Sequence, residues 1–399
     1  MKHEEIKILV SGASIAGLTS AYWLNKKGFE VTIVEKASKI RGGGYPIDVR
    51  GSAINIVKMM GIYEELKAQN LNNMKFKILD NDNSVISQFT DATMKANEDI
   101  EIPRGDLTTA LYKCVEENDI NLIFNDSIKT MNHLDNGVEI ELESGKQGSY
   151  DLVVGADGIH SNTRKLTFGE ESQFTNYLGH CFTGFTVENY LDMYKEGMIY
   201  SEPGRTAIMY ATENKESVHA FLIFSDEEEP SVNHRDIDGH KKLVKDKFKD
   251  VGGIAPNLLE TLEQTEDIYF DTTTQIIMDQ WAKNRAVLVG DAAHAPSFLT
   301  GQGSSLAMIG AYILADELEK NNSIKDAFIA YEKYMKPFAE INQNAVENDG
   351  SSILYPKNDE EIEKRNAILK QMENITEENM GSQDLIDITR VIDYPKLND

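Results

Sequence analysis

The sequence predicts an α/β fold in which a parallel sheet is interrupted by an antiparallel sheet and followed by a helical extension. Three observations support this prediction. A strand, a helix and a second strand follow one another within about thirty residues, over 6–35. Alternating apolar and polar residues recur between about 177 and 275, which is typical of antiparallel strands. After residue 286 a buried strand and long helices return.

The first elements form a βαβ unit. Ile6–Val10 is rich in β-branched residues, as expected of a buried strand. Ile15–Lys27 has apolar residues at helical spacing and ends at Gly28. Val31–Val34 is the second strand. Strands that a helix joins in this way lie parallel, with a right-handed connection.

The remaining elements follow from the same periodicities. A hairpin is expected over 75–89, and further strands at 121–124, 127–134, 138–143, 152–154, 181–187, 207–211, 219–224 and 286–289. Further helices are expected at 54–68, 107–117, 241–249, 304–320, 324–348 and 359–373. We therefore expect one domain made from two segments, an antiparallel-sheet domain between them, and a C-terminal helical extension, with the boundaries 1–172, 173–278, 279–348 and 349–399.

Composition excludes several classes of partner. The chain has 399 residues, 66 acidic and 40 basic side chains, and a net charge of −26. This acidic excess would repel nucleic acid and anionic membranes. Cys114 and Cys181 are too few for a disulfide framework or a zinc cluster, and Leu306–Ala315, the longest apolar stretch, is too short to span a bilayer. We expect a soluble, cytoplasmic monomer that binds small molecules and no metal.

A glycine-rich turn joins the first strand to the first helix. In Gly12-Ala13-Ser14-Ile15-Ala16-Gly17, Gly12 allows a tight turn, position 14 lets the backbone approach a pyrophosphate, and Gly17 lets the helix pack on the strand. Ser14 replaces the middle glycine of the usual fingerprint, and Ser14 and Ala16 are still small. The motif predicts a Rossmann-like dinucleotide site.

The second strand ends at an acidic residue. Glu35, with Lys36 beside it, is placed to accept a hydrogen bond from a ribose hydroxyl, although a solvated strand-end residue is the alternative. An acid here disfavours a 2′-phosphate, so the predicted ligand is NAD or FAD.

Three further motifs decide between these ligands. They are Arg104-Gly105-Asp106-Leu107, Gly155-Ala156-Asp157-Gly158, and Gly290-Asp291-Ala292-Ala293-His294-Ala295-Pro296 with Gly301-Gln302-Gly303. Together with the first turn, they stand in the order found in the flavin-dependent aromatic hydroxylases, the single-component (group A) flavoprotein monooxygenases. The sequence resembles this family over residues 6–320. The resemblance implies an FAD-binding domain and FAD as cofactor.

The resemblance also implies roles for individual residues. Arg104 and Leu107, at a helix start, would contact FAD, and Asp157 would serve both FAD and the reduced nicotinamide. We expect no catalytic side chain, because the cofactor carries the oxygen chemistry.

The last motif would surround the flavin ring. Asp291 would accept a hydrogen bond from the ribityl chain, and the loop from Pro296 through Gly301 to Gly303 would direct helical N–H groups at the flavin. His294 follows Asp291 closely, but in this family its position belongs to the scaffold, so we expect a structural residue instead of a general base.

One branch of the family is closer in pattern. Residues 6–35, 41–48, 102–107 and 301–318 resemble the tetracycline-inactivating monooxygenases, or tetracycline destructases. In that branch the matching positions would make Arg41 a contact of NADPH and Asp48 a contact of FAD. A surface residue beside a flexible loop is the alternative for Arg41.

The antiparallel sheet should form a largely apolar wall over the flavin. Candidate substrate contacts are Thr183, Arg205, His219, Phe224 and Phe298. Packing in a core (His219, Phe224) or an exposed turn (Arg205) is the alternative. The C-terminal helix over 359–373 is a lid, an interaction surface or a helix packed on the FAD domain.

The resemblance implies an FAD-dependent monooxygenase that uses NADPH or NADH and O2 to hydroxylate an aromatic or polyketide molecule. Tetracycline is the best candidate substrate, and its inactivation would confer antibiotic resistance. Three alternatives remain open: a hydroxylase of another phenol in catabolism or biosynthesis, a flavoprotein reductase, and a flavoprotein that sequesters its ligand without turnover.

Overall fold

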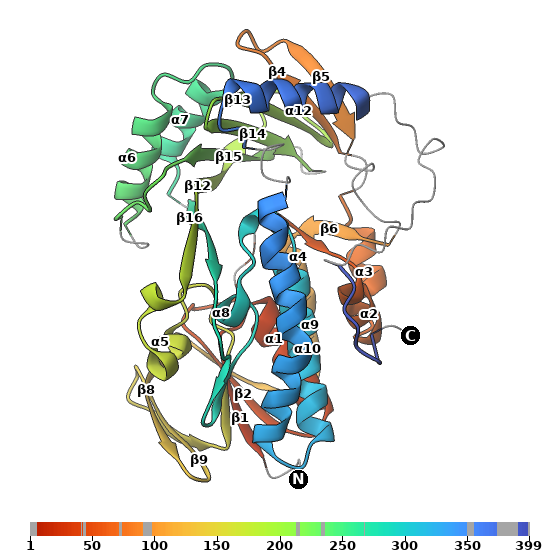
Figure 1. The fold of residues 1–399 in the computed structure, drawn as a ribbon, viewed down its shortest axis with the longest axis vertical. Coiled ribbons are helices and arrows are strands. Elements are labelled where there is room, and N and C mark those ends of the chain that lie inside the picture. Colours follow the sequence, from red (N-terminus) through yellow and green to blue (C-terminus); the bar gives the residue numbers. More distant parts are fainter. Residues whose placement is uncertain are drawn as a thin grey trace.

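The computed structural model describes residues 6–40, 42, 45–71, 74–90, 98–212, 216–232, 236–266, 268–348, 355–372 and 390–397. Two sheets divide the molecule, as Figure 1 shows: a parallel α/β part below and a large, mainly antiparallel sheet above. The predicted fold class is confirmed.

The parallel sheet is built around the first strand. Its order is β17-β18-β11-β1-β2-β7, and every neighbouring pair is parallel except the β17–β18 pair at one edge. The first strand is central and buried on both faces, which explains its continuous apolar run. The bounds are β1 Lys7–Ser11, β2 Glu30–Glu35, β7 Asn121–Phe124, β11 Leu152–Gly155, β17 Ala282–Lys283 and β18 Ala286–Leu288.

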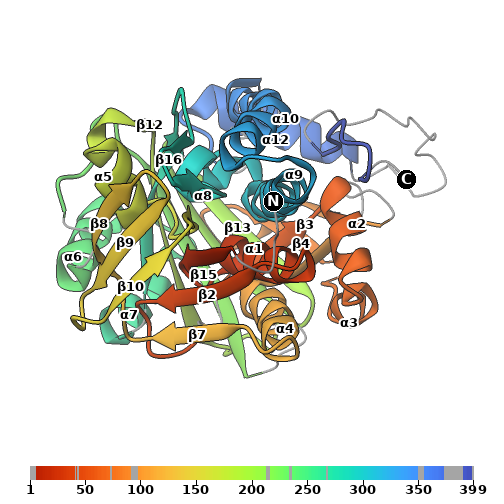
Figure 2. The same cartoon turned by 90° about the horizontal axis from the view of Figure 1, so that it is seen from below.

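Helices cover one face of this sheet and a small sheet covers the other. On the helical face α1 packs on α9 and α4, and α10 lies behind α9 (Figure 2). Their bounds are α1 Ile15–Lys26, α4 Arg104–Glu116, α9 Gly303–Lys320 and α10 Ile324–Asn344. Opposite them lies a three-stranded sheet made of β8 Ile128–Leu134, β9 Gly137–Leu142 and β10 Gln147–Tyr150.

The second large sheet has seven strands in the order β16-β12-β15-β14-β13-β4-β5. All neighbours are antiparallel except β13 and β4, which are parallel. The predicted hairpin, β4–β5, joins this sheet although it comes from the first third of the chain. The bounds are β4 Lys75–Leu79, β5 Val85–Thr90, β12 Thr175–Glu188, β13 Glu196–Glu202, β14 Arg205–Ala211, β15 Ser217–Ser225 and β16 Tyr269–Ile276.

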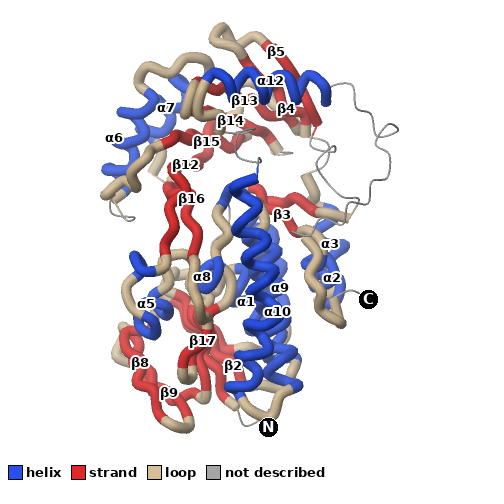
Figure 3. The backbone as a smooth tube through the Cα atoms, viewed as in Figure 1, coloured by secondary structure: helices blue, strands red, loops and turns tan. Residues whose placement is uncertain are grey.

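The two faces of the seven-stranded sheet have different neighbours. One, the helix-covered face, packs on α6 (Ile237–Phe248) and α7 (Ala255–Gln264), seen beside the upper sheet in Figure 3. The other, the inner face, meets loops of the α/β part and the helix α12 (Asp359–Met372). Successive side chains of each strand alternate between these faces.

The C-terminal segment contacts both parts of the molecule. The helix α12 packs on β5 and β13. Farther along the chain, residues 390–397 lie against the α/β part, near α2 in Figure 1. There Tyr394 is buried, and the carboxylates of Asp316 and Glu317 of α9 both lie within hydrogen-bond distance of its hydroxyl. Lys27, Lys320 and Lys396 also pair with Asp316, so these contacts hold the tail on the α/β part.

Several element predictions need correction. The single helix expected over 54–68 is two helices, α2 Ser52–Met59 and α3 Tyr63–Ala68, because Gly61 takes a left-handed conformation (φ +76°) between them. The α-helix expected to reach 348 ends at Asn344 and continues as a 3-10 turn. The sequence pattern also did not predict α5 (Asn162–Phe168), α7, α8 (Asp291–His294), β10, β13, β16, β17 or the short pair β3 (Pro46–Val49) and β6 (Ile100–Pro103). Among the described residues, no helix combines the length and apolarity that crossing a bilayer requires.

Candidate functional site

The turn between β1 and α1 is packed so closely that only glycine fits at two positions. A β-carbon on Gly12, whose φ is +102°, would lie 2.5 Å from the carbonyl oxygen of Ala156, and one on Gly17 would lie 1.9 Å from the carbonyl oxygen of Gly12. This is the close approach of helix, turn and strand that a dinucleotide fold requires. The turn therefore fits the predicted pyrophosphate site.

Ser14 and Arg104 meet in front of this turn. Ser14 precedes α1 but its side chain makes no capping hydrogen bond; it accepts one from Nη2 of Arg104 at 2.7 Å. Arg104 follows Pro103 at the start of α4. The structure thus brings a guanidinium to the N-terminal end of α1, where both the helix dipole and the positive charge favour phosphate.

Glu35 lies at the end of β2, as predicted. One carboxylate oxygen accepts from the backbone N–H of Ala13 and the other from that of Ala37, both at 2.8 Å. These bonds hold the side chain in place and leave acceptor capacity for a ribose hydroxyl, since each carboxylate oxygen has two lone pairs. Lys36 beside it is exposed.

The turn at Gly290 approaches the first helix from the other side. A β-carbon on Gly290 (φ +65°) would lie 2.9 Å from that of Ala16, so α1 packs directly against the start of α8 (Asp291–His294). Asp291 is exposed to solvent at the first position of α8. The protein around it nevertheless raises its pKa, while Arg104 lowers it and Asp271 raises it further. Asp291 and Arg104 are therefore close neighbours, and we call the region between them and the Gly12–Gly17 turn the recess.

The loop after α8 brings Asp48 into the same region. A β-carbon on Gly301 (φ +62°) would lie 3.2 Å from Oδ2 of Asp48, and Asp48 pairs with Arg50 at 2.8 Å. Gln302 is buried, and its Oε1 has no partner among the described residues. A buried acceptor of this kind needs a donor, and the glycine-lined turns leave room for a ligand. On both grounds the site fits FAD.

The remaining residues of this loop occupy defined places. Pro296 is buried, and its carbonyl accepts a hydrogen bond from Gln275. Gly303 lies at the start of α9, next to Asp291. A β-carbon added to Gly303 would lie 3.7 Å from Oδ1 of Asp291, at an ordinary contact distance. Leu107 is buried in the core behind α4, so its side chain supports the site from behind.

Asp157 organises its own loop. It accepts hydrogen bonds from the hydroxyls of Ser11 and Ser161, and from both the backbone N–H (2.8 Å) and the hydroxyl (2.9 Å) of Thr163. The neighbouring Arg164 is fully buried and donates to the carbonyl of Ala292 at 3.1 Å. This hydrogen bond links the loop after the Gly155–Gly158 motif to the Gly290–Pro296 motif.

His294 has the surroundings of a scaffold residue. It is 1% exposed, its ring lies 4.6 Å from that of Trp281, and neither ring nitrogen has a hydrogen-bond partner among the described residues. Burial lowers its pKa to about 4. A neutral imidazole packed between apolar neighbours agrees with the expected structural role.

Aromatic side chains gather where the inner face meets the α/β part. Phe182 and Phe298 stack at 4.3 Å between ring centroids, and Tyr45 lies 5.4 Å from Phe298, 5.9 Å from Phe221 and 5.7 Å from Tyr269. We call these five residues the aromatic wall. It offers flat apolar surface to a planar ligand.

The aromatic wall adjoins the charged residues of the recess. The pKa of the Tyr45 phenol is raised to about 12. Enclosure by the protein is the main cause, the carboxylates of Asp291 and Asp271 add to it, and the charge of Arg104 opposes it. A ligand on the wall would therefore lie next to the recess that fits FAD.

The structure divides the predicted substrate residues between the two faces. Phe298 belongs to the aromatic wall, and His219 stacks on Tyr210 of the inner face at 5.1 Å. Phe224 instead packs on Phe248 of α6, Thr183 donates to the carbonyl of Tyr269 from the helix-covered side, and Arg205 pairs with Glu202 and Asp250 beside α6. These three do not reach the aromatic wall, because strand neighbours alternate in direction.

The sequence did not single out Tyr45 or four residues of the inner face, namely Phe182, Tyr210, Phe221 and Tyr269. Strand parity read from the sequence alone does not reveal which aromatic side chains of the sheet face Phe298. The pairing of β15 with both β12 and β14 puts Phe221 on the inner side. Arg41, Gly43 and Gly44 lie outside the described residues.

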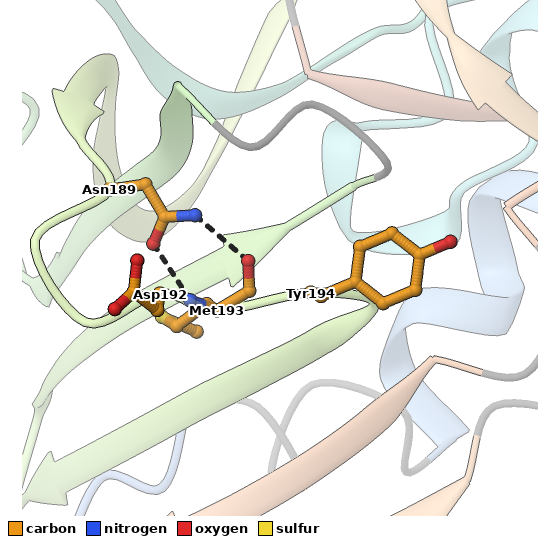
Figure 4. A pocket seen from close by; sticks show the side chains of 4 residues that line it. All are labelled: Asn189, Asp192, Met193 and Tyr194. Carbon is orange, nitrogen blue, oxygen red and sulfur yellow. Dashed lines mark hydrogen bonds between the residues drawn. The ribbon is translucent and has the colours of Figure 1, made fainter.

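A separate surface hollow lies away from this site. It has a volume of about 430 Å³ and is lined by Asn189, Asp192, Met193 and Tyr194 (Figure 4). Asn189 spans the turn by bonding the backbone N–H (2.9 Å) and carbonyl (2.8 Å) of Met193. No residue that the sequence predicted as a ligand contact lines it.

Comparison with known proteins agrees with this geometry. The profile of the family described as "FAD binding domain" matches residues 5–340. A flavin-dependent monooxygenase from an unknown prokaryotic organism is 36% identical over 369 residues, which cover 91% of this chain and 94% of that protein. Among crystal structures, tetracycline destructase Tet(55) has a TM-score of 0.83 and 34% identity, covering 93% of this chain and 97% of that one. Tetracycline destructase Tet(51) has a TM-score of 0.82 and 33% identity, covering 92% and 96%.

Proposed function

The chain belongs to the FAD-binding-domain family of flavin-dependent monooxygenases, and from this premise we propose that it uses NADPH and O2 to hydroxylate a polycyclic polyketide, tetracycline above all. The observation that carries the proposal is the similarity to two tetracycline destructases along nearly the whole chain, the seven-stranded sheet included. Fold similarity alone would not name a substrate. The aromatic wall gives an independent reason for a planar ligand.

Each part of the site has a task in this proposal. Bound FAD supplies the redox chemistry and the activation of O2. The Gly12–Gly17 turn and Arg104 hold the pyrophosphate, Glu35 holds the ribose, and Asp291 accepts a hydrogen bond from the ribityl chain. The first turn of α9 directs N–H groups at the ring.

The aromatic wall orients the substrate and excludes water. Apolar rings stack on the substrate's flat face, and removal of water strengthens the polar contacts that remain. No side chain of the recess is needed as a general acid or base: His294 is buried behind it and Asp157 is engaged within its loop.

The proposed co-substrate is NADPH, with NADH as the alternative. Arg41 is the proposed NADPH contact, from the family resemblance. The cytoplasmic location and the monomeric state expected from the sequence stay predictions.

The test is NADPH oxidation by the FAD-loaded protein with and without tetracycline. We expect tetracycline to stimulate NADPH oxidation, and the product to be one oxygen atom heavier. Tetracycline binding without turnover would favour sequestration. NADPH oxidation without oxygen transfer would favour a reductase, and stimulation by another phenol alone would favour a different hydroxylase. Each of these results would contradict the proposal.

A pair of glycine variants tests the placement of FAD. Gly17→Ala should abolish FAD retention, because its β-carbon would meet the Gly12 carbonyl. Gly310→Ala in α9 is the matched control, because its β-carbon would lie 3.5 Å or more from its neighbours. The absorbance of the purified proteins measures FAD content. A Gly17→Ala protein fully loaded with FAD would contradict the placement.

A further inference from the structure

Arg365 of α12 is a buried cation without an acidic partner. It is 3% exposed. Among the described residues its guanidinium donates only to neutral oxygens: Nη1 to Oγ of Ser201 at 2.7 Å, and Nε and Nη2 to Oδ1 of Asn366 at 3.2 and 3.1 Å. Three of its five N–H donors are thus used and two remain. A buried charge is costly unless it is paired, so this guanidinium is ready to receive an anion.

Arg365 points to the inner face. Ser201, its partner, lies opposite Thr206 across the β13–β14 pair and accepts a hydrogen bond from it at 3.1 Å. Leu369, one turn further along α12, packs in the same cluster as Ile199, Ile208 and other inner-face residues. α12 therefore places a positive charge at one end of the surface that carries the aromatic wall.

Tyr210 lies farther along the same strand, β14. It is 6% exposed, and its hydroxyl has no partner among the described residues. Its ring stacks between those of His219 at 5.1 Å and Phe221 at 6.0 Å, which fixes its direction. A buried phenol with a free hydroxyl is the second polar group on this face that lacks the partner its burial calls for.

The spacing of the two groups describes a ligand. Tyr210 and Thr206, which adjoins the Arg365 contact, are four residues apart on one strand, or about 13 Å at the rise of an extended chain. Ile208 lies between them, with Ile199 opposite it and Phe221 on the neighbouring strand. The surface is thus apolar in the middle and polar at both ends.

We propose that Arg365 and Tyr210 bind opposite ends of an elongated, flat substrate: Arg365 pairs with an anionic oxygen group, a carboxylate or the enolate of a 1,3-dicarbonyl, and Tyr210 donates to a carbonyl oxygen. The proposal rests on the proposed function for the reaction, and adds the chemistry and direction of the substrate. The end held by Tyr210 lies toward Tyr45 and the recess. The anionic end lies under α12. In a chain of net charge −26 an anion requires such a local cation.

Binding to the FAD-loaded protein tests this assignment without turnover. The probes are anthracene-2-carboxylate and the matched neutral anthracene-2-carboxamide, and the dissociation constants come from quenching of protein fluorescence. Arg365→Gln should weaken carboxylate binding by roughly tenfold or more, because a charge-assisted pair is lost, and change carboxamide binding by no more than about twofold. Arg365→Lys should restore part of the preference. Equal losses for both probes would overturn the proposal.

Controls separate recognition from folding. Lys364→Gln removes a cation from the adjacent position, which is exposed and paired with Glu360, and should leave both constants unchanged. Thermal unfolding of Arg365→Gln should occur at the wild-type temperature or above it, since an unpaired buried charge is removed. A clear fall in that temperature would indicate a merely structural arginine.

Two further results complete the test. The two probes carry no carbonyl at the end opposite their carboxyl or carboxamide group, so Tyr210→Phe should leave both constants unchanged. A third probe, 6-acetylanthracene-2-carboxylate, adds a ketone at that end, and Tyr210→Phe should weaken its binding by a few-fold. An unchanged affinity for this third probe would exclude Tyr210 from the site. If tetracycline fails to stimulate NADPH oxidation while the carboxylate preference still depends on Arg365, the proposed substrate is wrong and the anion site stands.

Discussion

The two faces of the seven-stranded sheet are built from the same strands and are both buried, yet they differ in one respect. On the helix-covered face, Phe224 contacts Phe248, and the hydroxyl of Tyr200 has two acceptors within reach of its one proton, Oδ1 of Asn81 and Oε1 of Glu202. On the inner face, the hydroxyl of Tyr210 has no partner among the described residues, and Arg365 has no acid. Burial by itself therefore does not separate structure from function. On this sheet, the two faces differ in whether their buried polar groups find partners.

Two phenylalanines of β15 give the largest expected contrast. Phe224→Ala should lower the free energy of unfolding by about 3–5 kcal/mol, because it leaves a cavity against α6, and should leave KM unchanged. Phe221→Ala should raise KM for the substrate by roughly tenfold, because it removes part of the aromatic wall. Denaturant unfolding and steady-state kinetics measure the two effects. A rise in KM for Phe224→Ala would erase the distinction between the faces.

The two tyrosines test whether hydroxyl partners distinguish the faces. Tyr200→Phe should cost about 1–2 kcal/mol of unfolding free energy, since its hydroxyl is hydrogen-bonded and its loss leaves Asn81 without a donor. Tyr210→Phe should be neutral or stabilising without ligand, since no bond is lost. Urea unfolding of the two variants measures both. A large loss of stability for Tyr210→Phe would mean that its hydroxyl is satisfied within the protein.

His180, a buried histidine of the inner face, should make the stability of the protein depend on pH. Burial and, to a smaller extent, the charge of Lys357 lower its pKa to about 4, against the opposing effect of Glu361. The ring contacts Ser225 and Tyr355. Between about pH 6.5 and 4 the unfolded chain binds a proton that the folded chain does not, so stability falls as pH falls through this window. At pH 5.5 His180 should shift the unfolding constant about tenfold relative to neutral pH.

The variant His180→Gln checks this slope. The variant should take up one proton fewer on unfolding between about pH 6.5 and 4. The proton taken up by His294, whose pKa is also about 4, should remain. Unfolding measured at several pH values gives the slope. An unchanged slope in the variant would show that His180 is not buried in its neutral form.

Arg205 should have the smallest effect. Its ion pairs with Glu202 and Asp250 lie at the edge of the helix-covered face, and Asp250 is largely exposed. Arg205→Gln should therefore change the unfolding free energy by at most about 1 kcal/mol, with no change in KM, in contrast to Arg365→Gln. A KM effect as large as that of Arg365→Gln would place Arg205 in the site, as the sequence had suggested.

Part of the proposed FAD site could be predicted because its signals are local. Gly12, Gly17 and Glu35 lie within one βαβ unit, and their spacing determines their arrangement once the strand, turn and helix form. Arg104, Asp291 and Gly301 lie far apart in the chain but each occupies a strand or helix end. Their convergence on one site was expected from the family resemblance and not from their spacing in the chain.

The substrate region was not predictable in the same way. Residue types alone selected Thr183, Arg205 and Phe224, which lie on the helix-covered side, and overlooked Tyr45 and Tyr210. A strand register shifted by one residue reverses every side chain, and register depends on pairing with strands distant in sequence.

The sequence by itself determined the α/β fold, the dinucleotide turn and the net charge of −26, because these follow from short-range periodicity and composition. The tertiary structure alone decided which face of the seven-stranded sheet meets the recess, that the hairpin β4–β5 joins that sheet, and that α12 buries Arg365 against β13. Those outcomes depend on contacts between segments more than a hundred residues apart. Such contacts are selected by packing and by the pairing of buried polar groups, which no local pattern records.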